Sequence, residues 1–111
     1  MDTGFATLPQ PPYYAVIFSS QRTPGEGGYG AMADRMMELA EKSPGFLGAE
    51  SARSAEGFGI TVCYWRSLEE IAAWKQDAEH QVAQKLGRDQ WYQGFRLRVA
   101  KVERAEAWDK P

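Results

Sequence analysis

The chain contains a single histidine, His80, and this is the residue best suited to acid–base chemistry. The ordinary pKa of histidine lies between about pH 5 and 8, so the side chain can accept a proton near neutrality. His80 follows Asp77, a residue type that often caps a helix N-terminus. Because a helix N-terminus disfavours imidazolium, we expect a neutral His80 that acts as general base or donates to a phenolic or carbonyl oxygen. The alternative is a histidine that bonds only a backbone group.

Aromatic residues in the second half of the chain suggest a binding site. Tyrosine and tryptophan combine a large apolar surface with one polar group, so they suit a flat cleft for an aromatic ligand. Core and interface packing is the alternative for most of them. Tyr64 and Trp65 are neighbours in an expected strand, so one faces the helices and the other the opposite side. The candidates for lining the cleft are Tyr64, Trp74, Trp91 and Tyr92.

Two polar residues complete the set of candidate substrate-binding residues. Ser19 lies near the end of the first expected strand and has no neighbouring base that would make it a nucleophile. Arg98 belongs to a run of basic residues in the last expected strand. An anionic substrate would use Arg98, whereas the alternative is a set of solvated or paired edge charges.

Motifs of other chemistries are incomplete. Gly25, Gly27 and Gly30 have the spacing of a dinucleotide-binding loop, but the strands that follow form a hairpin rather than a parallel unit. One histidine and one cysteine, Cys63, match no metal-ligand spacing, so we expect no metal. A mid-strand Cys63 is expected to be structural, with a raised pKa.

Composition excludes several classes of function. Thirteen Lys and Arg against fifteen Asp and Glu give a net charge of −2, which argues against a general nucleic-acid binder. No apolar run approaches the roughly 20 residues of a membrane helix, and the N-terminus has no secretory pattern. A single cysteine fits a reducing compartment, so we expect a cytoplasmic protein without membrane association.

Hydrophobic periodicity predicts one domain over residues 13–106, between a flexible proline-rich tail at 1–12 and a short tail at 107–111. Ser67 and Glu70 have the form of a capping box that opens the second helix, whose expected inner face includes Leu68, Ile71 and Lys75. Because Ser67–Tyr92 is long for one helix, we expect a break near Gln76, with Asp77 as a second N-cap. Strands are expected at 13–20, 46–55, 58–65 and 95–105, and helices at 29–42 and from 67 onward.

The order β-α-β-β-α-β predicts an α+β fold of the ferredoxin-like kind, with a four-stranded antiparallel sheet and both helices on one face. The first and third strands are apolar on both faces, and two helices cover only one of them. A bare apolar face is unfavourable, so we expect a second copy of the chain to cover it in a two-fold homodimer.

The chain resembles the antibiotic biosynthesis monooxygenase family. The similarity covers about residues 13–105 and is carried by runs that include 44–48, 64–70, 74–75, 79–80, 87–88, 91–92 and 99–104. The resemblance implies a dimeric α/β barrel. Members of the family range from cofactor-independent oxygenases of polyketide phenols to enzymes that degrade haem.

The resemblance favours a cofactor-independent monooxygenase that oxidises a small aromatic, phenolic or quinol substrate with O₂, with His80 as the base. One alternative is a non-catalytic barrel that binds a small molecule. The other is a haem-binding or haem-degrading enzyme, which the resemblance favours less. Haem breakdown in this fold uses an Asn on the first strand, a Trp on the second helix and a His ten residues later. Trp74 matches this Trp, but position 84 is Gln and the first strand has no Asn.

Overall fold

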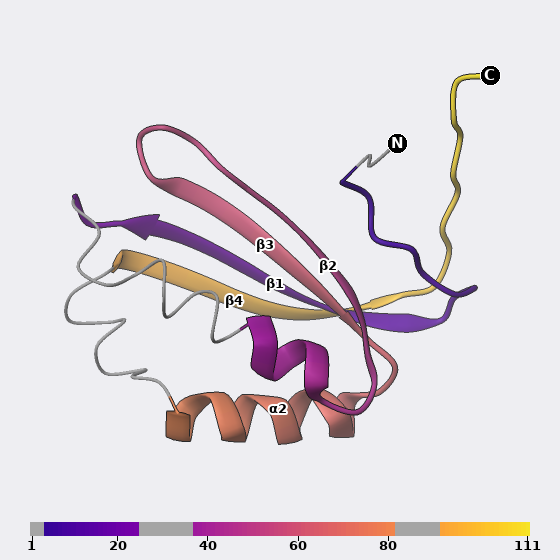
Figure 1. Cartoon of the computed structure of the whole chain (residues 1–111), viewed down its shortest axis with the longest axis horizontal. Coiled ribbons are helices and arrows are strands. Elements are labelled where there is room, and N and C mark those ends of the chain that lie inside the picture. Colours follow the sequence, from indigo (N-terminus) through magenta and orange to yellow (C-terminus); the bar gives the residue numbers. More distant parts are fainter. Residues whose placement is uncertain (1–3, 25–36, 82–91) are drawn as a thin grey trace.

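The computed structural model describes residues 4–24, 37–81 and 92–111, with only the backbone at 78–81 and 92. Helical residues 37–42 precede β2, and α2 lies on the same face of the sheet (Figure 1). The elements are β1 (Tyr13–Arg22), β2 (Phe46–Arg53), β3 (Phe58–Trp65), α2 (Leu68–Gln81) and β4 (Tyr92–Val102). The start of the expected first helix and the end of the second lie outside the described residues.

The four strands form one antiparallel sheet in the order β2-β3-β1-β4. β1 and β3 are its central strands, which explains why the sequence is apolar on both of their faces. The predicted α+β fold with β-α-β-β-α-β order is therefore confirmed. Four strand boundaries differ from the prediction, because β1 extends to Arg22, β2 ends at Arg53, and β4 runs from Tyr92 to Val102.

Strand register defines two faces of the sheet. Residues paired directly across a ladder point to the same side. Val16 pairs with Cys63, and both belong to the buried cluster against α2, so we call this side the helix face. Ile17 pairs with Val62 and with Arg98 on the opposite side, which we call the open face.

The hydrophobic core lies between the helix face and the helices. Its centre is Trp65, whose side chain is fully buried, and Cys63 is buried beside it. Burial raises the pKa of the Cys63 thiol to about 11, as expected for a structural cysteine. The buried cluster is completed by Val16, Ala40 and Ile71.

The β2–β3 hairpin turns through the four residues 54–57. The Gly57 N–H donates to the Ser54 carbonyl over 3.0 Å, and the Ser54 N–H donates to the Phe58 carbonyl over 2.8 Å. Gly57 has φ +94°, a conformation that favours glycine. The predicted turn at Glu56-Gly57 is present, and its four-residue length explains why β2 is shorter than expected.

The predicted capping box opens α2. The Glu70 N–H donates to Ser67 Oγ over 3.2 Å, and Ser67 Oγ donates to Glu70 Oε1 over 2.9 Å. Arg66 pairs with the same carboxylate over 2.9 Å, and this hydrogen bond, followed by that from Ser67, lowers the Glu70 pKa. Where the chain enters β2, Gly45 has φ +84°, a conformation that favours glycine, and a Cβ there would displace the Glu70 carboxyl group, whose carbon would lie 2.2 Å away.

The predicted break near Gln76 is wrong, because α2 is continuous from Leu68 to Gln81. Asp77 lies inside the helix and does not begin a second one. Alanine, lysine and glutamine surround it, and their high helix propensity outweighs the preference of one aspartate for a cap. The inner face also differs, since Ile71 is buried but Leu68 is 51% exposed.

The N-terminal segment lies against the open face beside β2. The Ala6 N–H donates to Glu50 Oε2 over 3.1 Å. Ala6 and Leu8 lie so close to Gly48 that a Cβ there would be 3.0 Å from the Ala6 Cβ. These contacts give residues 4–12 a place on the sheet that their proline-rich sequence did not predict.

Candidate functional site

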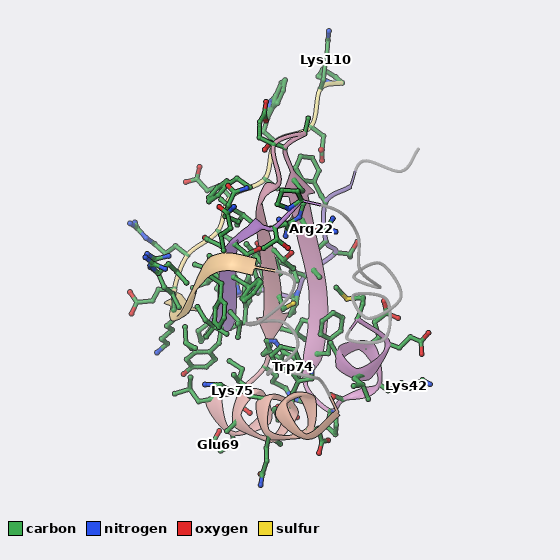
Figure 2. The ribbon with its side chains drawn as sticks, turned by 90° about the vertical axis from the view of Figure 1, so that its left-hand side faces the viewer. Arg22, Lys42, Glu69, Trp74, Lys75 and Lys110 are labelled. Carbon is green, nitrogen blue, oxygen red and sulfur yellow. The ribbon has the colours of Figure 1, made fainter. Side chains whose placement is uncertain are left out.

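The sheet separates the candidate residues onto two faces. Trp74 extends from α2 toward the sheet (Figure 2) and packs against the core cluster. Tyr64, Ser19 and Arg98 lie on the open face, because they pair with Ala15, Ile60 and Ile17 respectively. The structure therefore does not bring these three residues into one cleft with Trp74, and their role in substrate binding stays a prediction.

Three aromatic rings form the centre of the helix-face site. The Trp65 ring lies 5.3 Å from the Trp74 ring at an interplanar angle of 38°. Phe46 meets Trp65 edge-on, with ring centroids 5.4 Å apart. We call Phe46, Trp65 and Trp74 the aromatic cluster. The sequence left open whether Tyr64 or Trp65 faces the helices, and the register shows that it is Trp65.

Both tryptophans of the aromatic cluster carry a buried donor. Within the part of the chain that the structure describes, Nε1 of Trp65 and Nε1 of Trp74 have no hydrogen-bond partner. A buried indole N–H usually finds an acceptor, because leaving it unpaired costs free energy. These two unpaired N–H donors lie on the helix face, and the sequence analysis did not single out Trp65 as a binding residue.

A hollow of about 520 Å³ adjoins the aromatic cluster. It lies between residues 37–42 and the edge strand β2, and it is bounded by Phe46 and Ala49, which both pack against the core cluster. Glu41 also lines it, and Glu50 borders it from β2, although the Glu50 carboxylate bonds Tyr64 on the open face. The hollow thus combines one aromatic residue, Phe46, with an acidic residue, Glu41.

Glu50 also organises the open face. Tyr64 donates to Glu50 Oε1 over 2.7 Å, and Tyr13 packs edge-on against Tyr64 with centroids 5.7 Å apart. Burial, followed by the hydrogen bond to Glu50, raises the Tyr64 pKa to about 12. Tyr64 is therefore a neutral hydrogen-bond donor at physiological pH. Sequence patterns alone did not single out Glu50, because its partner lies on another strand.

A second polar contact on the helix face was also not predicted. Arg53 Nη2 donates to Ser20 Oγ over 2.9 Å, and its Nη1 donates to the Gly57 carbonyl. The guanidinium crosses β3 over Gly59, where a Cβ would lie 2.7 Å from Cζ. The alternation of strand residues puts Ser20 on this face and Ser19 on the other, a signal that was present in the sequence.

The other predicted site residues have no described side chain. Trp91 lies outside the described residues, and only the backbone is described at His80 and Tyr92. Because α2 is unbroken, six residues at about 100° each place position 80 about 120° around the axis from Trp74. A break in the helix was expected to turn His80 toward Trp74. Because the helix is continuous, that turn is absent.

The described residues contain no group of three or more histidine, cysteine, aspartate or glutamate side chains arranged to hold a metal ion. Within the same residues, no helix is both long enough and apolar enough to cross a membrane.

The sequence is similar to two curated proteins. Uncharacterized protein YqjZ of Bacillus subtilis (strain 168) is 54% identical over 96 residues, which cover 86% of this chain and 84% of that protein. Jasmonate monooxygenase ABM of Pyricularia oryzae is 29% identical over 94 residues. That match covers 80% of this chain but 43% of the fungal protein, so the chain spans less than half of its length.

Solved structures share the fold. A mutant of SnoaB, a cofactor-independent oxygenase from Streptomyces nogalater, has a TM-score of 0.71 at 7% identity over 84% of this chain and 95% of that one. A conserved protein from Methanosarcina mazei has a TM-score of 0.67 at 9% identity, covering 85% and 94% of the two chains.

The family model for antibiotic biosynthesis monooxygenase matches residues 12–86, from the start of β1 to beyond the described part of α2. This match covers more than half of the chain and includes the elements that carry the aromatic cluster. The protein therefore belongs to the antibiotic biosynthesis monooxygenase family.

Proposed function

We propose that the protein is a monooxygenase that oxidises a small aromatic, phenolic or quinol substrate with O₂ and uses no added cofactor. The aromatic cluster beside the hollow is the observation that carries this proposal, because its ring Phe46 lines the hollow and an aromatic wall suits a flat substrate. The fungal relative and the oxygenase SnoaB, both named for oxygenation, support the same reaction class.

The substrate supplies all the electrons in this reaction. A phenol such as 1-naphthol loses its hydroxyl proton, and the electron-rich ring adds O₂ at the para carbon. Loss of water from the peroxide leaves a carbonyl, so that C₁₀H₈O and O₂ give C₁₀H₆O₂ and H₂O. One oxygen atom enters the quinone and the other enters water. The protein orients the ring, excludes water and accepts the proton.

His80 is the proposed proton acceptor, and Glu41 is the carboxylate that would replace it. Histidine is the residue type that ordinarily accepts a proton near neutrality, but position 80 lies about 120° around α2 from Trp74. Glu41 lines the hollow directly. Loss of a general base typically lowers the rate by about 10²–10⁴. The variants His80→Ala and Glu41→Gln therefore decide between the two groups.

Oxygen uptake with 1-naphthol tests the proposed function. We expect consumption of O₂ and formation of 1,4-naphthoquinone in equal amounts, above the rate without protein. His80→Ala is expected to lower this rate about 10²–10⁴-fold. If His80→Ala keeps the full rate and Glu41→Gln is slow, Glu41 removes the proton. If the protein binds 1-naphthol but no oxygen is consumed, the proposed oxygenase activity is wrong and the alternative, a non-catalytic small-molecule-binding protein, is favoured.

We also propose that a second copy of the chain covers the open face. Phe58 is 48% exposed and Ile60 is 43% exposed on this face, next to the half-buried Ile17 and Val62. Burial of such an apolar surface against another copy is favourable, and two-fold dimers are the commonest closed assembly. A single buried thiol fits a reducing compartment, so we assign the dimer to the cytoplasm.

A further inference from the structure

One row of side chains on the open face has opposite charges at its two ends. The row consists of Glu50, Val62, Ile17 and Arg98, each paired directly with the next across the four strands. Neighbouring strands lie about 4.8 Å apart, so the Cα atoms of Glu50 and Arg98 are about 14 Å from one another. Two aliphatic side chains stand between the charges, and no ion pair joins them in the described part of the chain.

The carboxylate of Glu50 is held in a fixed position on this face. Tyr64 donates to Oε1 over 2.7 Å, and the Ala6 N–H donates to Oε2 over 3.1 Å. A carboxylate has about four acceptor sites, so these two donors leave room for a guanidinium. Glu50 is also half-buried, and partial exclusion of water strengthens its attraction for a cation.

The opposite edge of the open face is positive. Arg96 and Arg98 lie on this face of β4, because they pair with Ser19 and Ile17. Both arginines are exposed, and neither forms an ion pair with another residue that the structure describes. The open face therefore carries a basic β4 edge and, in the row of Arg98, an acidic group at the β2 edge.

This charge distribution distinguishes two ways in which a second copy can cover the open face with its strands aligned. If the two-fold axis runs across the strands, β4 lies over β4 of the partner, and the arginines of the two copies face one another. If the axis runs along the strands, β4 lies over β2 of the partner, and each row stays level with itself. Arg98 then faces Glu50 of the partner subunit, and the symmetry repeats this contact. Like charges at an interface are unfavourable, so the second arrangement is preferred.

We propose that the open faces of two copies pack with the two-fold axis along the strands, and that Arg98 of each copy binds Glu50 of the partner subunit. The inference rests on the dimer of the proposed function, gives it an orientation and requires no turnover. It assigns Arg98 to the partner subunit rather than to an anionic substrate. Because Glu50 bonds Tyr64 and borders the hollow, each copy completes a polar network beside the other copy's candidate site.

Charge reversal in two separate chains tests this pairing. A homodimer of Arg98→Glu would face two carboxylates against one another in each row, and a homodimer of Glu50→Arg would face two guanidiniums. A mixed dimer of the two variants has opposite charges at both contacts. Each variant alone is expected to raise the dimer Kd about 100-fold. In an equimolar mixture, native mass spectrometry should find the mixed dimer well above its statistical share of one half.

Lys101→Glu is the matched control for Arg98→Glu. Lys101 is exposed on the same strand and pairs with Tyr14, so the same change of charge falls on the helix face. It is expected to change the dimer Kd less than about twofold. If Glu50→Arg does not fold, Glu50→Gln replaces it, because Arg98→Glu combined with Glu50→Gln has no like-charge contact. That double variant is expected to dimerise about tenfold more tightly than Arg98→Glu alone.

The outcomes separate this inference from the proposals on which it rests. If the wild type dimerises but the mixture has statistical proportions, or if Arg98→Glu and Lys101→Glu weaken the dimer equally, the pairing is wrong and the dimer stands. A monomeric wild type would overturn both. Preferential mixed dimers without oxygen uptake from 1-naphthol would uphold the pairing and refute the oxygenase activity.

Discussion

Tyr64 and Trp65, adjacent in β3, serve opposite faces of one sheet. Tyr64 donates to Glu50 on the open face, and Trp65 lies fully buried on the helix face. The alternation of side chains along a strand produces this division. Tyr64 thus makes a polar contact with the edge strand β2, and the next residue, Trp65, forms the centre of the aromatic cluster.

The raised Tyr64 pKa predicts a loss of stability in alkali. The phenol is retained to about pH 12 in the folded chain but ionises near its usual pKa of 10 when unfolded. Its contribution is therefore complete below pH 10 and is lost as the pH rises from 10 toward 12. In urea unfolding, Tyr64→Phe is expected to show a smaller decline over this range than the chain with Tyr64.

Cys63 must be removed from this comparison, because burial raises its pKa to about 11. Ionisation of this thiol would also lower the folding stability as the pH rises, over a range that overlaps that of Tyr64. Both chains should therefore carry Cys63→Ala. At pH 8, loss of the hydrogen bond to Glu50 is expected to cost Tyr64→Phe about 1 kcal/mol. Parallel declines above pH 10 would contradict the role of Tyr64.

The fold was predictable from the sequence because its signals are local. The capping box at Ser67 and Glu70 and the turn at Gly57 depend on neighbours in the chain, and both are present. The break at Asp77 was predicted from helix length and one cap residue, and the propensity of the surrounding residues outweighed both.

The site was less predictable because its contacts join distant strands. Glu50 and Tyr64 lie 14 positions apart in the sequence, and they meet only once β2 and β3 pair in a given register. A register shift between Phe46 and Gly48 puts Phe46 on the helix face opposite Trp65, and a pattern of strict alternation does not contain such a shift. Tyr64, Trp65 and Trp74 were recognised as aromatic candidates and Phe46 was not, and the division of these residues between the two faces depends on this pairing.

Removal of residues 1–12 tests whether the N-terminal segment stabilises the sheet. The Ala6 N–H bonds Glu50, and Leu8 is half-buried near Gly48. We expect the free energy of unfolding to fall by about 1–2 kcal/mol. Removal of residues 107–111, which are exposed, is the control and should leave the midpoint of thermal unfolding in place. An equal midpoint for both truncations would uphold the simple tail expected from the sequence.

The N-cap of α2 is expected to be a point of sensitivity. Ser67→Ala removes the acceptor of the Glu70 N–H, and such a change costs about 1 kcal/mol. Glu69→Gln lies in the same first turn without a role in the capping box and serves as control. Urea unfolding of the two variants should separate them, and equal midpoints would show that the cap adds no stability.

The open face gives the clearest prediction about assembly. We expect light scattering to report twice the 12.5 kDa chain mass at micromolar concentration. Ile60 is 43% exposed on this face, so Ile60→Lys would bury a charge in the dimer and should give a single-chain mass. Leu68 is 51% exposed on α2, away from the open face, and Leu68→Lys should leave the dimer intact. A wild-type chain that scatters as a monomer, or two variants that behave alike, would mean that a second copy does not cover this face.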